Sequence, residues 1–229
     1  MADQTLAGIE LLGGLTPAER QAVERRCRWR RHAADEQIID RETDTHDVFF
    51  VVSGGVRVVN FAVSGREISF DDILAGGYFG ELAAIDGRRR SATVVAAVDT
   101  LTASLPGPVF LEVLAQHPAA ALALMRRLAA VVRQSTGRIM DLSTQGAHNR
   151  IYAELLREAK ANAAGNNRAA IRPLPTHTEI AARVSTTRET VARTLADLAR
   201  KRLIKREGRA LVLLDVTRLR EMVEEFRAE

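Results

Sequence analysis

The sequence is poor in the residues that build disulfides, metal clusters and membrane spans. Cys27 is the only cysteine among 229 residues, so the chain can form no internal disulfide and cannot hold a four-cysteine iron–sulfur cluster. No run of about 18 apolar residues occurs, so we expect no membrane span. The opening residues, MADQTLAGIE, lack the charged and apolar regions of a signal peptide. We therefore expect a protein of the reducing cytoplasm.

The residue patterns of enzymes and metal sites are also missing. No nucleophile lies in a pattern with a base, and the histidines show no spacing typical of metal ligands. The five histidines are His32, His46, His117, His148 and His177. We expect no enzyme activity, metal site or haem, and detectable hydrolysis of a substrate would contradict this.

The charge that is present is unevenly distributed. The net charge is only +4, with an isoelectric point near 9.8. Residues 183–209, however, carry nine Lys or Arg against three Asp or Glu, a local excess of six. This distribution favours a nucleic-acid partner for the C-terminal part. A hydrophobic content of 46% is ample for a packed core.

The N-terminal half predicts a short helical region followed by a β domain. Residues 5–29 read as helical, with Thr16-Pro17-Ala18-Glu19 as a capping box. Residues 30–115 contain short apolar or alternating runs broken by Gly54-Gly55 and Gly76-Gly77. Such spacing predicts short antiparallel strands in a sandwich, roll or barrel. Residues 110–114 return to a helix.

A long helix is predicted over residues 118–142. Residues at alternating four- and three-residue spacing would form a heptad seam. They are Leu124, Leu128, Val131, Ser135, Arg138 and Leu142. The seam favours a symmetric dimer, whereas the alternative is one helix packed on its own domain. Residues 142–149 then read as a hinge, residues 150–163 as a helix, and residues 164–173 as a polar loop.

The segment Phe79–Val95, FGELAAIDGRRRSATVV, has the residue types of a nucleotide site. Gly80 lets backbone approach a ligand closely. Arg90 supplies a planar charged fork suited to phosphate, and Ser91 adds a hydroxyl donor. Glu81 would repel phosphate, but it can accept hydrogen bonds from a ribose. The alternative is a helical turn with a surface ion pair.

The segment resembles the phosphate-binding cassette of cyclic-nucleotide-binding domains. The matching residues are Phe-Gly-Glu-Leu-Ala and, after a glycine-containing spacer, Arg-Ser-Ala-Thr. The resemblance implies that Glu81 binds the ribose 2′-hydroxyl and that Arg90 and Ser91 bind the cyclic phosphate. Arg89 departs from the cassette, which often has proline there. The resemblance also adds pocket residues, namely Val58, Phe70, Gly80 and Leu82, and it implies that Ser135 meets the base of its own subunit's ligand and Thr136 that of the partner.

The C-terminal part predicts a winged helix-turn-helix. Thr176-His177-Thr178-Glu179 is a capping box that starts one helix, and Ser185-Thr186 forms a turn. A second helix carries its apolar face at Val191, Leu195 and Leu198. Two strands, residues 203–205 and 210–214, would form the wing. A last helix is marked by four apolar residues, Leu219, Met222, Val223 and Phe226.

The exposed face of the second helix has the residues for reading bases. Arginine reads guanine in the major groove, and a carboxylate accepts from cytosine. The run Arg188-Glu189-Thr-Val-Ala-Arg193 resembles the recognition helix of the Crp/Fnr family. The resemblance implies that Arg188 and Arg193 bind guanines, that Glu189 binds cytosine, and that three further residues hold phosphates, namely Thr176, His177 and Thr187. Alternatively, Glu189 closes a capping box with Thr186.

The resemblance to the Crp/Fnr family of bacterial transcription regulators covers nearly the whole chain. It implies an α+β fold with a cyclic-nucleotide-binding antiparallel β-roll (1–117), a dimerisation helix and hinge (118–145) and a winged helix-turn-helix (146–229). The implied function is that of a homodimer that binds palindromic TGTGA-like DNA when cyclic AMP, or cyclic GMP, occupies the roll. Bacterial RNA polymerase is the implied partner.

Three alternatives to this function remain at the level of sequence. The protein could respond only to cyclic GMP, because Ser91 suits either purine. It could bind DNA without a ligand and carry a vestigial pocket. It could also be a haem- or redox-sensing relative, although the intact cassette and the single Cys27 disfavour this reading.

At the turn of the helix-turn-helix, Ser185 stands where the family usually has glycine, and that position requires a positive φ angle.

Overall fold

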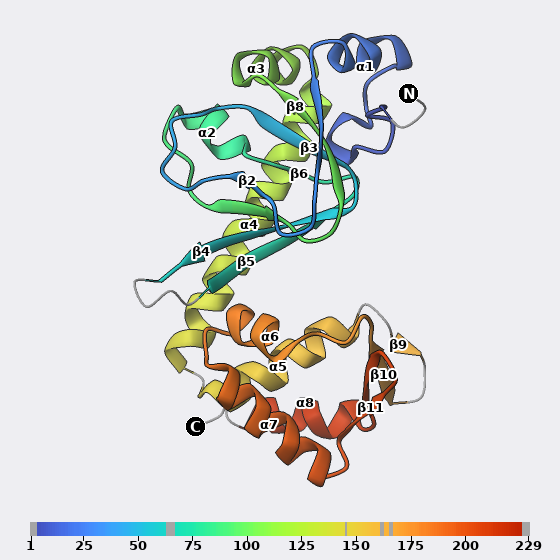
Figure 1. Cartoon of the computed structure of the whole chain (residues 1–229), viewed down its shortest axis with the longest axis vertical. Helices are drawn as coiled ribbons and strands as arrows, with labels where there is room; N and C mark the ends of the chain where they lie inside the picture. Colours follow the sequence, from blue (N-terminus) through green and yellow to red (C-terminus); the bar gives the residue numbers. More distant parts are fainter. Residues whose placement is uncertain (1–3, 63–66, 145, 161–162, 165–166, 226–229) are drawn as a thin grey trace. The chain divides into compact units, whose positions relative to one another are not determined.

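The computed structural model describes residues 4–62, 67–144, 146–160, 163–164 and 167–225. The chain divides into two compact units, residues 1–132 and 133–229. The first unit contains two antiparallel sheets and the second contains helices with one small sheet (Figure 1). The predicted α+β class, with a β-roll, a long helix and a winged helix-turn-helix, is confirmed.

The N-terminal helical region is shorter than predicted. A 3-10 turn, η1 (Glu10–Leu12), precedes α1 (Pro17–Glu24). The capping box is confirmed: the Thr16 hydroxyl accepts from the Glu19 N–H, and the Glu19 carboxylate accepts from the Thr16 N–H at 2.7 Å. The helical prediction for residues 5–29 is wrong at its end. Residues 28–32 form β1 (Arg28–His32) because their backbone groups pair with those of β8 (Thr100–Leu105).

Two four-stranded antiparallel sheets form the roll, as predicted. One has the order β1-β8-β3-β6 and the other the order β2-β7-β4-β5. Their bounds are β2 (Gln37–Ile39), β3 (Val48–Ser53), β4 (Gly55–Phe61), β5 (Glu67–Leu74), β6 (Tyr78–Phe79), β7 (Thr93–Ala96) and β8 (Thr100–Leu105). An apolar cluster joins the two sheets, and its buried members are Ile39, Val51, Val56, Ile73, Phe79 and Val94.

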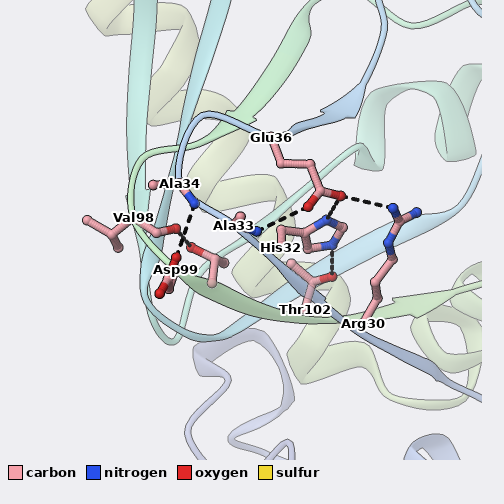
Figure 2. A network of polar contacts seen from close by, with 9 residues as sticks. Arg30, His32, Ala33, Ala34, Glu36, Val98, Asp99 and Thr102 are labelled. Carbon is pink, nitrogen blue, oxygen red and sulfur yellow. Dashed lines mark hydrogen bonds and ion pairs between the residues drawn. The ribbon is translucent and has the colours of Figure 1, made fainter.

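A buried histidine fastens the first sheet to the loop that follows β1 (Figure 2). His32 is 4% exposed. Its Nδ1 lies 3.0 Å from Glu36 Oε1, and its Nε2 lies 3.0 Å from Thr102 Oγ1. Glu36 also accepts from Arg30 and from the Ala33 N–H. These hydrogen bonds, led by the one to His32, lower the pKa of Glu36. Position 32 therefore serves the architecture of the roll.

The long helix is confirmed, but the predicted seam is exposed only in part: Val131, Ser135 and Leu142 are exposed on α4, whereas Leu124 is buried. The helix α3 (Gly107–Gln116) is followed by α4 (Pro118–Thr144). Leu124 is buried in the core of the roll and Leu128 packs against that core. The stripe on the exposed side of α4 runs at alternating three- and four-residue spacing through Leu122, Met125, Ala129, Val132, Thr136 and Ile139. We name these six residues the α4 stripe. The predicted dimer seam includes Leu124, but this residue packs on its own domain.

Within the described residues, the second unit has four helices besides the end of α4, together with one small sheet. Its elements are α5 (Ala147–Lys160), β9 (Ala163–Ala164), β10 (Arg168–Ile171), α6 (His177–Arg183), α7 (Arg188–Arg200), β11 (Ile204–Glu207), β12 (Ala210–Leu213) and α8 (Val216–Glu225). The wing hairpin and the last helix are confirmed, although Phe226 lies outside the described residues. The predicted polar loop at 164–173 is wrong. Residues 168–171 pair with β12, and Ala169 and Ile171 are buried against the helices.

The break between α4 and α5 is narrower than the predicted hinge. The helix α4 continues to Thr144 and α5 begins at Ala147. Within the part of the chain that the structure describes, no single helix has the length and apolarity to cross a membrane. The helices α3 and α4 meet these two criteria only when they are counted together, and the pair is bent by 112° at the break between them.

Candidate ligand and DNA-binding sites

The cassette begins where β6 leaves the sheet. Phe79 pairs with Phe49 of β3. The two rings stack with their centroids 5.0 Å apart. The chain then reverses at Gly80, which has φ of 84°, and enters α2 (Glu81–Asp86). At this φ, a Cβ at position 80 would lie 2.9 Å from the backbone oxygen of Asp47 and 2.7 Å from Arg90 Nη1, so only glycine fits.

The guanidinium of Arg90 forms hydrogen bonds with three groups around the cassette. Its side chain is buried, at 3% exposure for the residue. Nε donates to Thr45 Oγ1 at 2.9 Å, Nη1 to the Gly80 carbonyl at 2.9 Å, and Nη2 to the Asp47 carbonyl at 2.8 Å. Burial lowers the pKa of Arg90 below its ordinary value. Arginine has five N–H donors, and these described bonds use three of them.

The other predicted pocket residues differ in their surroundings. Glu81 is half-buried, and burial raises the pKa of its carboxyl group, while the charges of Arg127 and Arg90 oppose that rise. Ser91 is exposed, and Leu82 is 43% exposed. Val58 packs against the inter-sheet cluster. Phe70 is 40% exposed, whereas its neighbours Ser69 and Ile73 are buried.

Two charged residues near the cassette were missed from the sequence. Asp71 of β5 is the cross-strand partner of Val58. Its Oδ2 lies 3.4 Å from Nη2 of Arg127 on α4. The Arg127 guanidinium also lies over the Tyr78 ring, 5.1 Å from its centroid. Both charges act on the pKa of Glu81. Asp71 lies on the same face of β5 as Ile73, since the two residues pair with Val58 and Val56, but the register shifts between Asp71 and Ser69, so simple alternation along the sequence does not locate this carboxylate.

Ser135 and Thr136 lie beyond residue 132, in the second compact unit. Both are exposed on α4, and Thr136 belongs to the α4 stripe. Their contact with the base of a nucleotide stays a prediction. Among the described residues, no group of three or more His, Cys, Asp or Glu side chains is placed to hold a metal ion.

The helix-turn-helix presents a polar edge formed by α6 and α7. Thr176 caps α6 and, as predicted, forms a capping box with Glu179. Thr187 caps α7 by accepting from the Thr190 N–H at 3.2 Å. The alternative interpretation, a capping box between Thr186 and Glu189, is wrong, because Thr186 is 7% exposed and Thr187 is the N-cap of α7. The predicted phosphate contacts, Thr176, His177 and Thr187, are all exposed.

The residues predicted to read bases lie on the first half of α7. Arg188, Glu189 and Arg193 are exposed. The opposite face of the helix is buried through Val191 and Leu198. The pKa of Glu189 is lowered, first by its own backbone N–H and next by the Thr187 hydroxyl. The carboxylate is thus ionised near neutral pH and can only accept hydrogen bonds.

The turn between α6 and α7 carries the unusual backbone predicted for it. Ser185 has φ of 52°, in the left-handed region. The Thr186 N–H returns to the Ala181 carbonyl at 3.0 Å, which holds the turn tightly. The predicted positive φ angle at this serine is confirmed, and because left-handed backbone disfavours residues with a Cβ, we expect a small strain there.

A roll that carries this cassette, joined to a winged helix-turn-helix, defines a DNA-binding transcription regulator with a sensor-type domain. Residues 29–117 match the family of cyclic nucleotide-binding domains, and residues 149–222 match the Crp-like helix-turn-helix domain. The chain belongs to the Crp/Fnr family of transcription regulators.

Individual relatives agree with this membership. The chain is 33% identical to transcriptional regulator SdrP of Thermus thermophilus, over 76% of this chain and 82% of the relative. It is 28% identical to the CRP-like cAMP-activated global transcriptional regulator of Mycobacterium tuberculosis, over 75% and 77% of the two chains. Among solved structures, a CooA mutant from Carboxydothermus hydrogenoformans matches with a TM-score of 0.80 at 24% identity, covering 93% and 94%. That last likeness concerns the fold alone.

Proposed function

We propose that this regulator is a homodimer whose affinity for DNA is controlled by a cyclic nucleotide in the roll. The observation that carries the proposal is the cassette itself. A left-handed Gly80, a buried Arg90 and a half-buried Glu81 converge within one short segment. The same chain carries an exposed set of base-reading residues on α7.

In the proposed site each polar group has one task. The ribose 2′-hydroxyl donates to the Glu81 carboxylate, and the cyclic phosphate accepts from Arg90 and from the Ser91 hydroxyl. Val58, Leu82 and Phe70 supply apolar contact, and Ser135 and the partner's Thr136 meet the base. Cyclic AMP is the favoured ligand, supported by the name of the cAMP-activated relative, and cyclic GMP is the alternative.

The DNA-binding half follows from groove chemistry. Arg188 and Arg193 donate to guanines, and Glu189 accepts from cytosine, on a half-site that resembles TGTGA. Thr176, His177 and Thr187 bind phosphates and set the register. The palindrome requires two copies, and we propose the α4 stripe as the dimer interface. A ligand gates this binding only if it prefers the DNA-competent form. RNA polymerase as partner, a cytoplasmic location and the domain bounds 1–117, 118–145 and 146–229 are parts of the proposal.

A second candidate is DNA binding that needs no nucleotide. It is favoured by the engagement of Arg90 with Thr45, Gly80 and Asp47, which satisfies much of the guanidinium without a phosphate. A thiol-based redox sensor is disfavoured. Burial raises the pKa of Cys27 to about 12, so little thiolate exists at neutral pH to react.

Fluorescence anisotropy of a labelled TGTGA-type palindrome separates the candidates. The protein is titrated without ligand, with cyclic AMP and with cyclic GMP, at one salt concentration because phosphate contacts make affinity salt-dependent. A scrambled duplex is the control. Tightening by one nucleotide on the palindrome alone supports gating and names the purine. Tight binding that ignores both nucleotides supports the second candidate and overturns the first.

A further inference from the structure

The helix α5 carries a row of charged side chains that contact the end of α6 and the turn after it. Arg150, Glu154 and Glu158 are spaced four residues apart, so they follow one another along a single face of the helix. We name these three residues the α5 ladder. Neighbouring positions, Ile151 and Leu155, are buried in the apolar core of the unit. The ladder therefore lies at the border of that core, where α6 packs against α5.

Arg150 of the α5 ladder binds the backbone of the turn after α6. Arg150 Nε donates to the Val184 carbonyl at 2.9 Å. Its Nη2 donates to the Ser185 carbonyl at 3.4 Å. Val184 is the C-cap of α6, and Ser185 is the left-handed residue of the turn. The last carbonyls of a helix lack partners within the helix, and a cation near them is favourable. Arg150 thus caps α6 from a neighbouring helix.

Glu154 and Glu158 of the α5 ladder bind the last residue of α6. Arg183 is its last residue, and Arg183 Nη1 lies 2.8 Å from Glu158 Oε1. The same nitrogen lies 3.8 Å from Glu154 Oε1. Glu154 is only 3% exposed, and its Oε2 lies 2.7 Å from Nη1 of Arg157. Three consecutive residues, 183 to 185, are thereby fixed to one face of α5.

Stability is a poor reason for such an arrangement. Burial raises the pKa of Glu154, which means that ionising this carboxyl group in the folded protein is costly. Buried ion pairs contribute little net stability, because desolvation offsets the attraction. The α5 ladder instead fixes the position of the turn. The helix α7 begins at Arg188, three residues after Ser185, whose carbonyl Arg150 binds.

We propose that Arg150, Glu154 and Glu158 are positioning residues that fix the turn after α6 and so set the orientation of the recognition helix α7 for base reading. They touch no base themselves. This inference rests on DNA binding by the helix-turn-helix and does not need the nucleotide proposal. A charge from α4 also reaches the ladder, since Arg138 acts on the pKa of Glu154.

The test compares specific with non-specific DNA binding in the full chain. The specific duplex is the sequence that the wild-type protein itself selects from a random library, and the competitor is its scrambled form. Arg150→Lys keeps the charge but cannot reproduce the planar fork. We expect it to lower the specific-to-scrambled affinity ratio about tenfold, the loss typical of one charge-assisted hydrogen bond. Affinity for the scrambled duplex should stay within about twofold, because phosphate contacts carry it.

Glu154→Gln separates positioning from stability. Because the pKa of Glu154 is raised by folding, the folded state holds its proton more tightly, and stability falls as pH rises through that pKa. The glutamine removes this fall, so thermal unfolding at neutral pH should be unchanged or higher while the affinity ratio drops. The double variant Glu154→Gln, Glu158→Gln should lower the ratio further, since Arg183 then loses the negative charge of both carboxylates. The control Glu221→Gln removes an exposed ion pair to Arg218 on α8 and should change neither quantity.

Amide hydrogen exchange of the free protein gives an independent readout. In Arg150→Lys the amides of residues 184–188 should exchange at least about fivefold faster than in the control, because the capped turn opens more often. Unchanged exchange in this segment would overturn the proposal, whatever the DNA result. An affinity ratio that stays constant while both affinities fall together with thermal stability would also overturn it, since that is the signature of a merely structural role.

Discussion

Replacing Arg90 by alanine should destabilise the N-terminal unit as well as weaken ligand binding. The guanidinium donates to Thr45 and to the carbonyls of Gly80 and Asp47. An acceptor left unsatisfied in a buried site costs about 1–3 kcal/mol. For two half-buried carbonyls we therefore expect a loss of roughly 2–4 kcal/mol. That is a large part of the 5–15 kcal/mol typical of a domain.

Trp29 makes this loss measurable. It is the only tryptophan of the chain, lies in β1, and packs against the core of the roll, so its fluorescence follows unfolding of the N-terminal unit. With a slope of about 2 kcal/mol per molar urea, the midpoint should fall by roughly 1–2 M. Ser91→Ala is the matched variant, because Ser91 is exposed and the substitution should leave the midpoint unchanged.

The two variants together can refute the reasoning. An unchanged urea midpoint for Arg90→Ala would show that the hydrogen bonds of Arg90 contribute no net stability. If the folded fraction of that variant binds cyclic nucleotide as the wild type does, Arg90 is a structural residue only. The phosphate assignment would then be wrong even though the stability loss was correctly predicted.

Three further predictions concern the turn, the pH response and the dimer. Ser185→Gly should raise the free energy of unfolding by about 0.5–1 kcal/mol in thermal or urea unfolding, since glycine removes the left-handed penalty at φ of 52°; a loss of stability would contradict the strain. Cyclic-nucleotide affinity, measured by calorimetry, should fall as pH drops through the pKa of Glu81, which burial places above its ordinary 4.5, because the proposed ribose contact needs the carboxylate; the dependence should vanish in Glu81→Gln, and its persistence there would rule out that group. Val132→Glu, at a position 63% exposed in the α4 stripe, should give monomers in light scattering at micromolar concentration, whereas the matched Arg133→Glu should not; an intact Val132→Glu dimer would place the interface elsewhere.

Local signals predicted most of the fold. Capping boxes marked the starts of α1 and α6, glycine pairs separated the strands, and two short runs at residues 203–205 and 210–214 marked the wing. The errors occurred where tertiary contacts override local pattern. Residues 28–29 look helical in sequence but pair with β8, and β10, with only four residues, is too short to be recognised without its partner β12.

The register of α4 shows the same limit. Heptad spacing is compatible with two neighbouring stripes of the helix, and only burial tells them apart. Leu124 packs beside Phe110 in the core of the roll, whereas Met125 is 58% exposed. Likewise, the cassette motif identified Gly80, Glu81 and Arg90, but not Asp71. The pairing of Asp71 with Arg127 joins positions 56 residues apart in the sequence, and no local pattern encodes it.

The central claim is that nucleotide and DNA binding are coupled. The most direct measurement is calorimetric titration of cyclic AMP, and in parallel cyclic GMP, into the free protein and into its complex with the selected duplex. Coupling between two sites is reciprocal, so one nucleotide should bind the complex more tightly than the free protein. The factor should equal that by which the same nucleotide tightens DNA binding. Equal affinity for free and DNA-bound protein would contradict the account, because a ligand that does not distinguish the two forms cannot act as the switch.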